Sequence, residues 1–144
     1  NGKEHPLTGQ GWFDHEWSSQ LMDASTAGWD WFSLHLDSGA KIMAFRMRLS
    51  GQTDYISGSY IEPNGTSTAL SSSELALVPQ GQTEVSGRLY PLAWRLNLPS
   101  KNINLKLQAS KNDQVNSGRF TYYEGALDIS GTHSGRGFME LTGY

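Results

Sequence analysis

The densest group of side chains capable of chemistry is Asp14-His15-Glu16-Trp17, in which two carboxylates flank an imidazole and an indole follows. In an extended strand, Asp14 and Glu16 face the same way, with Cα atoms about 6–7 Å apart. A carboxyl pair at that spacing can perform acid/base catalysis when one member has a raised pKa. His15 then faces the opposite way and, with Trp17, is a candidate to line a pocket. The alternative is that the two acids simply form a solvated strand face.

A second unusual group is Trp29-Asp30-Trp31, in which an acid lies between two indoles. Strand alternation places Asp30 on the face shared by Phe32 and Leu34, where an unpaired carboxylate is costly. We therefore expect either a salt bridge to an arginine or a turn cap, or else a catalytic acid with a perturbed pKa in a cavity. Trp29 and Trp31 either close one end of a barrel or bind a flat apolar ligand.

The third group is Tyr122-Tyr123-Glu124-Gly125, from which Tyr123 and Glu124 are candidate ligand-binding residues. They face opposite sides of a strand, so at most one of them can reach any given pocket. Glu140 is another acid within a hydrophobic strand. We expect a buried arginine to pair with at least one of these acids, and the available arginines are Arg46, Arg48, Arg95 and Arg136.

Composition and motifs exclude several classes of function. The formal net charge is −3 and no Lys/Arg run stands out, so neither a nucleic acid nor a polybasic membrane contact is expected. Cysteine is absent and the four histidines are scattered, so we expect no metal site and no cofactor. Nucleophile-elbow, phosphate-loop and dinucleotide motifs are missing. No apolar run approaches the roughly 20 residues of a transmembrane helix, and we expect no signal peptide within these residues.

The elements that position these residues are short alternating runs separated by Gly, Asn, Asp, Ser and Pro, in a chain with 16 glycines and 11% aromatic residues. This pattern predicts an all-β fold: one antiparallel barrel of about eight strands over residues 1–144, or a barrel-like sandwich, with a hollow interior that collects the indoles, the histidine and the acids. The predicted strands are Gly11–Ser18, Trp29–Asp37, Lys41–Leu49, Asp54–Glu62, Glu74–Val78, Leu89–Leu98, Asn102–Ala109, Phe120–Ser130 and Gly137–Tyr144.

Five blocks of the sequence, in order, resemble the AttH-like lipocalin family: GWFDHEWSS, GWDWFSLHLDSG, YPLAWRLNLP, YYEGALDISG and GRGFMELTGY. Members are predicted secreted hydrolases that are distantly related to carotenoid hydratase. The resemblance implies a lipocalin-like barrel, a periplasmic or secreted location, and an N-terminal lipocalin-like partner domain, because members are about twice as long. This chain is similar to their C-terminal half.

The resemblance also bears on the chemistry. His15-x-Trp17 is similar to a His-x-Trp pair of the carotenoid hydratases, which also use an aspartate on a following strand. The strand at residues 42–46 has no acid at all, which argues against hydration of a polyene by that mechanism. From the family resemblance we expect a hydrolase-type or hydratase-type enzyme domain that acts on a hydrophobic small molecule. The alternatives are a non-catalytic lipocalin-like carrier of an apolar ligand and a structural partner of a missing N-terminal domain.

Overall fold

Strands dominate the chain, as the two-residue alternation predicts. The computed structural model describes residues 2–14 and 25–144. In that part of the chain, the longer strands are β1 (Thr26–Leu36), β2 (Lys41–Leu49), β3 (Tyr55–Ile61), β8 (Ala93–Leu98), β9 (Ile103–Ala109), β11 (Thr121–Gly131) and β12 (Gly135–Thr142). The shorter elements are β4 (Ser67–Ser71), β5 (Ala76–Pro79), β6 (Thr83–Val85), β7 (Arg88–Tyr90), β10 (Val115–Ser117) and the 3-10 turn η1 (Pro99–Lys101).

The hairpin of β1 and β2 is the part of the fold on which the candidate site depends. The strands pair antiparallel with Asp30 opposite Arg46 and Phe32 opposite Ala44. Gly39 closes the turn with a φ of +88°, a backbone conformation that favours glycine. Its N–H donates to the carbonyl of Leu36 at 2.9 Å. The predicted strands Trp29–Asp37 and Lys41–Leu49 therefore pair as a hairpin.

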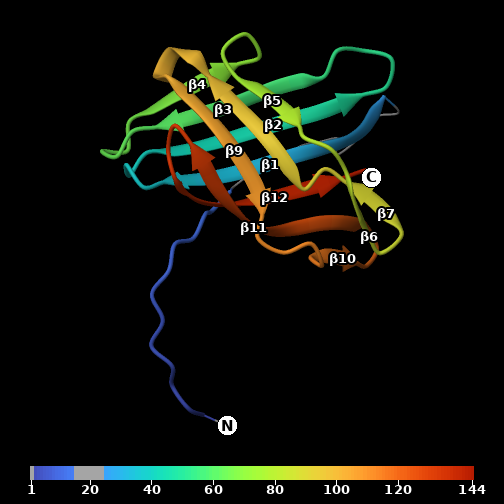
Figure 1. The fold of residues 1–144 in the computed structure, drawn as a ribbon, viewed down its shortest axis with the longest axis horizontal. Helices are drawn as coiled ribbons and strands as arrows, with labels where there is room; N and C mark the ends of the chain where they lie inside the picture. The colour runs from blue at the N-terminus through green and yellow to red at the C-terminus, as the bar shows by residue number, and fades with distance from the viewer. Residues whose placement is uncertain (1, 15–24) are drawn as a thin grey trace.

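One antiparallel sheet of ten strands forms the body of the described chain, in the order β4-β3-β2-β1-β12-β11-β9-β8-β5, with β10 paired to β11. The sheet curls so that β8 and β9 pass across β1, β2 and β3 (Figure 1). A two-stranded sheet of β6 and β7 lies near one end. The predicted antiparallel lipocalin-like barrel is confirmed as a curled sheet whose edge strands are β4 and β5.

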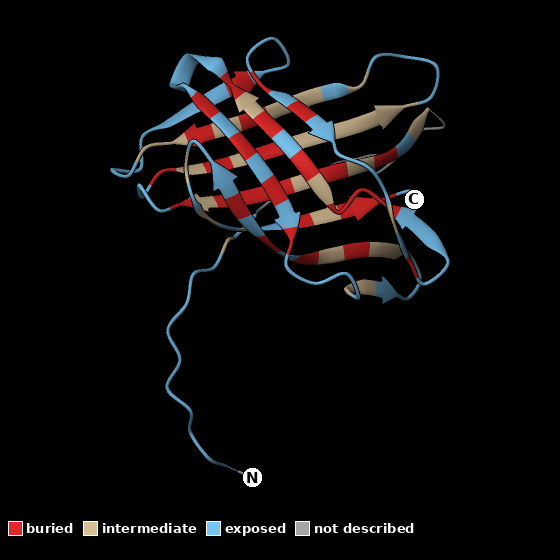
Figure 2. Ribbon diagram, viewed as in Figure 1, coloured by how far each residue is buried: buried red, intermediate tan, exposed pale blue. Residues whose placement is uncertain are grey.

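The interior of the curled sheet is filled by side chains, not hollow as the sequence suggested. Bands of buried residues alternate with exposed ones along β8 and β9 (Figure 2). Trp94, Tyr90, Tyr123 and Phe32 are among the largest fully buried side chains. The rings of Phe32 and Trp94 meet edge to face with centroids 5.1 Å apart, so the two layers are in direct contact.

Two sequence predictions change in the structure. The predicted strand Gly11–Ser18 is not formed over residues 11–14, where the backbone has no strand pairing, and its remainder lies outside the described residues. The predicted strand Leu89–Leu98 is divided into β7 and β8 at Pro91, which cannot donate a ladder hydrogen bond. In Figure 1 the N-terminus lies well away from the sheet, and the N-terminal segment reaches the sheet near β1, β11 and β12.

Candidate functional site

A groove of about 1020 Å³ lies on the outer face of the sheet, over β1, β2, β11 and β12. We call it the outer groove. Its apolar surface comes from Trp12, Trp29, Trp31, Phe45, Met47 and Phe138. Strand alternation explains its position: Phe32 and Leu34 of β1 point into the core, so Trp29 and Trp31 must point outward. Aromatic side chains on the outside of a sheet are exposed to solvent unless something covers them.

The segment from Gly9 to Asp14 forms one wall of the outer groove. Trp12 contacts Trp31 and His35 edge to face, with ring centroids 6.3 Å and 5.7 Å away. Its indole N–H donates to the carboxylate of Asp14 at 3.0 Å. This wall is therefore held on the sheet by aromatic packing, with Asp14 exposed at the rim of the groove.

Two carboxylates sit opposite each other at one end of the outer groove. Glu124 of β11 and Glu140 of β12 are direct cross-strand partners, and both line the groove. The indole N–H of Trp29 donates to Oε1 of Glu140 at 2.8 Å, and Nδ2 of Asn116 donates to Oε2 of Glu124 at 3.3 Å. Like charges directly opposite each other on a sheet repel. The hydrogen bonds fix these carboxylates in place despite that repulsion.

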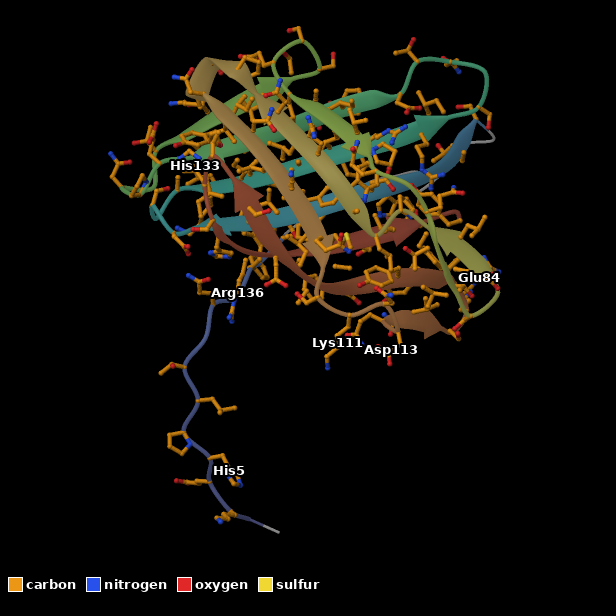
Figure 3. The ribbon with its side chains drawn as sticks, in the orientation of Figure 1. His5, Glu84, Lys111, Asp113, His133 and Arg136 are labelled. Atoms are coloured by element: carbon orange, nitrogen blue, oxygen red, sulfur yellow. The ribbon has the colours of Figure 1, made fainter. Side chains whose placement is uncertain are left out.

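Nitrogen-bearing side chains occupy the other end of the outer groove. His35 and Arg136 are cross-strand partners of β1 and β12, and both line the groove. Burial lowers the pKa of His35, and the positive charge of the nearby Lys41 lowers it further. His35 is thus neutral near pH 7 and offers one N–H donor and one acceptor. Figure 3 shows Arg136 beside the N-terminal segment.

Asp30 lies on the opposite face of β1 and is fully buried. Its Oδ1 accepts a hydrogen bond from the hydroxyl of Tyr144 at 2.7 Å. Its Oδ2 lies 3.7 Å from a terminal nitrogen of Arg46 and 3.6 Å from Nε of Arg48. Burial raises the pKa of Asp30 to about 6, while Tyr144 and the two arginines act in the opposite direction. The predicted arginine pairing is thus found at Asp30, and the raised pKa comes from burial in the packed core, not from a position in a cavity.

The surroundings of Asp30 tie the chain's last residues to the end of the barrel. Arg48 lies over the ring of Tyr144, 3.9 Å from its centroid, and donates to the carbonyl of Thr142. Burial, followed by the charge of Asp30, raises the pKa of the Tyr144 hydroxyl. Asp54 binds Arg46 at 2.6 Å. We read this group as a structural closure, because it lies away from the outer groove and its charges are partnered within it.

The sequence-predicted site residues divide between the two faces of the sheet. Four of them meet at the outer groove, namely Asp14, Trp29, Trp31 and Glu124. Asp30 and Tyr123 are buried on the inner face, and Asp30 lies on the opposite face of β1 from Trp29 and Trp31, as strand alternation predicted. Tyr123 and Glu124 face opposite ways, as predicted. His15, Glu16 and Trp17 lie outside the described residues.

Sequence reasoning did not assign Glu140, His35 and Trp12 to the pocket. Glu140 was expected to pair with an arginine, yet its oxygen accepts from the indole of Trp29. Two facts together would have found these residues. The odd-numbered side chains of β1 point outward, and the register of β1 on β12 places Glu140 beside them. Register depends on contacts more than 100 residues apart in the chain, which alternation alone cannot give.

Within residues 2–14 and 25–144, no group of three or more His, Asp or Glu side chains is arranged to hold a metal ion. The same described part of the chain contains no helix with the length and apolarity needed to cross a bilayer.

The curled antiparallel sheet with an aromatic groove defines a lipocalin-like β-protein. The AttH-like family model matches residues 1–144, and the chain belongs to the AttH-like family. An AttH protein of Nitrosomonas europaea has a solved structure that is 29% identical, with a TM-score of 0.79, covering 89% of this chain and 42% of that one. The comparison therefore supports both the fold and the family.

Two further relatives carry names of enzymes. Kievitone hydratase of Nectria haematococca has a structure that is 27% identical with a TM-score of 0.68, covering 81% of this chain and 39% of that one. The dehydratase asqC of Emericella nidulans is 22% identical over 138 residues, which cover 86% of this chain and 38% of the relative. The chain thus spans about two-fifths of the length of the relatives it matches.

Proposed function

We propose that this chain is the groove-bearing part of a hydratase-type or dehydratase-type enzyme, and that the outer groove holds a hydrophobic small molecule. The observation that carries the proposal is the joint position of an aromatic surface and two opposed carboxylates, Glu124 and Glu140, in a single groove. Support comes from the two relatives whose names describe addition or removal of water. In ligand sites, apolar walls with a few placed polar groups are the usual arrangement.

The carboxylate pair supplies the two proton transfers that such a reaction needs. In hydration of a carbon–carbon double bond, the protonated carboxyl gives its proton to one carbon. Water attacks the other carbon, and the ionised carboxylate takes the proton that this water releases. Proton exchange with solvent then returns both groups to their starting forms.

Trp29 is the positioning residue in this proposal. Its indole N–H holds Oε1 of Glu140 at 2.8 Å, so the carboxyl keeps a fixed orientation toward the groove. Trp31 and Trp12, which meet edge to face, provide the apolar surface against which the substrate rests. Asp14 lies at the rim, and His15, Glu16 and Trp17, which follow it in the chain, are kept as candidates from the sequence.

The experiment is an incubation of the chain with a panel of aryl alkenes in water labelled with heavy oxygen, followed by mass spectrometry. The proposal expects a labelled alcohol from at least one alkene. Glu140→Gln should abolish the product, and Glu84→Gln, a charge-matched change on β6, should leave it intact. Saturable binding with no labelled product would favour the alternative of a non-catalytic carrier. A chain that binds none of the panel would contradict both readings.

An N-terminal lipocalin-like domain and export to the periplasm or the medium remain part of the proposal. The chain matches only 42% of the length of the Nitrosomonas europaea protein, which supports the proposal that the whole protein is longer than this chain. Fractionation of cells that produce the whole protein, with a blot against this chain, tests the location. Recovery only in the cytoplasmic fraction would contradict export.

A further inference from the structure

The outer groove is polar at both ends, with opposite character. At one end, Glu124 and Glu140 face each other across β11 and β12. At the other end, Arg136 of β12 faces His35 of β1. Both pairs line the same groove, and aromatic side chains lie between them. Such a surface selects not only for apolarity but also for the direction in which a molecule lies.

The separation of the two ends follows from strand geometry. Glu140 and Arg136 are four residues apart on β12, and an extended strand advances about 13 Å over four residues. Because their residue numbers differ by an even number, both side chains project from the same face. Trp31, opposite Glu140, and Ser33, opposite Phe138, occupy the stretch between the ends. A two-ring or three-ring molecule matches this length.

Neighbouring charges strengthen the contrast between the ends. Lys41 is the partner of His35 on β2 and adds positive potential beside it. Asp128 faces Arg136 from β11 and accepts a hydrogen bond from Ser110 at 2.9 Å, and it does not line the groove. Among the described residues no ion pair joins Asp128 to Arg136, so the guanidinium keeps donors available to a ligand. At the other end, the N–H of Trp29 is already used by Glu140.

We propose that the outer groove binds flat, elongated molecules that carry a hydrogen-bond donor, such as a phenolic hydroxyl, at the Glu124/Glu140 end and an anionic or carbonyl acceptor at the His35/Arg136 end. This inference rests on the proposed function, since it names the class of molecule for the same groove. A carboxylate would pair with the guanidinium of Arg136 and accept from His35. The hydroxyl would donate to a carboxylate oxygen.

The test uses three biphenyl probes and isothermal titration calorimetry on the whole chain. The hydroxy-acid probe carries a hydroxyl at one end and a carboxylate at the other. The di-acid probe carries a carboxylate at each end, and the neutral probe carries a hydroxyl alone. We expect the hydroxy-acid probe to bind most tightly, the neutral probe less tightly and the di-acid probe most weakly, since one carboxylate of the di-acid must face two glutamates.

Two variants test which end of the groove binds which group of the probe. Arg136→Gln should weaken the hydroxy-acid probe about fivefold, as befits an exposed ion pair, and leave the neutral probe unchanged. Glu140→Gln should strengthen the di-acid about tenfold, a gain that a misfolded variant cannot produce. The matched controls are Arg95→Gln on β8 and Glu84→Gln on β6, neither of which lines the groove, and they should change no affinity.

The outcomes separate this inference from the proposed function. If the neutral probe binds but the di-acid binds as tightly as the hydroxy-acid, or neither variant changes the preference, the directional inference is overturned and the groove remains a ligand site. If the neutral probe shows no binding to the wild-type chain, the proposed function itself fails, and this inference fails with it.

Discussion

Replacing Asp30 with asparagine tests how the barrel closes around its buried charge. Asp30 is fully buried, and its two arginine contacts, at 3.6 and 3.7 Å, are too long for good hydrogen bonds. Loss of hydration therefore outweighs the attraction of the arginines and of the Tyr144 hydroxyl, and the pKa of Asp30 rises from 3.8 to about 6. Asparagine keeps the shape of the side chain and removes its titration.

The sign and size of the effect follow from proton linkage. Between pH 4 and pH 6 the folded chain binds a proton at Asp30 more tightly than the unfolded chain does. The stabilisation from this proton is complete below about pH 4 and is lost as the pH rises through about 6. A rise in pKa from 3.8 to about 6 corresponds to about 3 kcal/mol. The free energy of unfolding should therefore fall by about that amount from this group alone.

The assay is urea unfolding, followed by tryptophan fluorescence, for the wild type and Asp30→Asn at about pH 4 and about pH 8. Subtracting one protein from the other cancels every other titrating group. The difference, variant minus wild type, should be about 3 kcal/mol more favourable to the variant at the higher pH. A difference that does not change with pH, or that changes in the opposite direction, would refute the dominance of burial over the arginines.

A second variant checks the local cause. The hydrogen bond from Tyr144 lowers the pKa of Asp30, so Tyr144→Phe should raise that pKa further. The loss of stability should then extend to a higher pH than in the wild type. An unchanged pH window would show that the hydroxyl does not interact with Asp30 in solution.

Three further predictions concern the core, a close approach of the neighbouring strands β2 and β3, and the groove wall. Trp94→Ala should destabilise the fold by about 3–5 kcal/mol in urea unfolding, because the indole is fully buried, whereas Phe120→Ala at an exposed site should cost less than about 0.5 kcal/mol. Gly58→Ala should cost about 1–3 kcal/mol, because the new Cβ would lie 2.5 Å from the carbonyl oxygen of Met43; a melting temperature equal to that of the wild type would contradict this contact. Trp12→Ala should weaken the neutral biphenyl probe about tenfold without lowering the melting temperature, since the indole packs on the outer face as a wall of the groove and not in the core.

Local alternation was enough to predict the strands whose two faces differ strongly. In β9, residues Ile103, Leu105 and Leu107 are buried and the residues between them are exposed, as the pattern of apolar and polar positions indicates. The β1–β2 hairpin was also predictable, because a short turn containing Gly39 joins two alternating runs. These features are set by neighbours in the sequence and need no long-range information.

The inner and outer faces of β1 could not be assigned from the sequence. Large side chains occur on both: Phe32 and Leu34 on one, Trp29 and Trp31 on the other. The inner face is set by the packing of Phe32 on Trp94, a residue 62 positions away in the chain. The hydroxyl that binds Asp30 belongs to Tyr144, which is 114 positions away. A hollow interior was expected because several strands carry large side chains on both faces, but Trp94 fills the interior while Trp29 and Trp31 lie on the outer face.

A crystal structure of the chain with the hydroxy-acid probe bound would show directly whether the outer groove is the ligand site. We predict the probe along β1 and β12, with its rings against Trp31 and Trp12, its carboxylate at Arg136 and its hydroxyl at Glu140. A probe found inside the curled sheet near Trp94 and Asp30, or bound elsewhere with the groove empty, would contradict the claim.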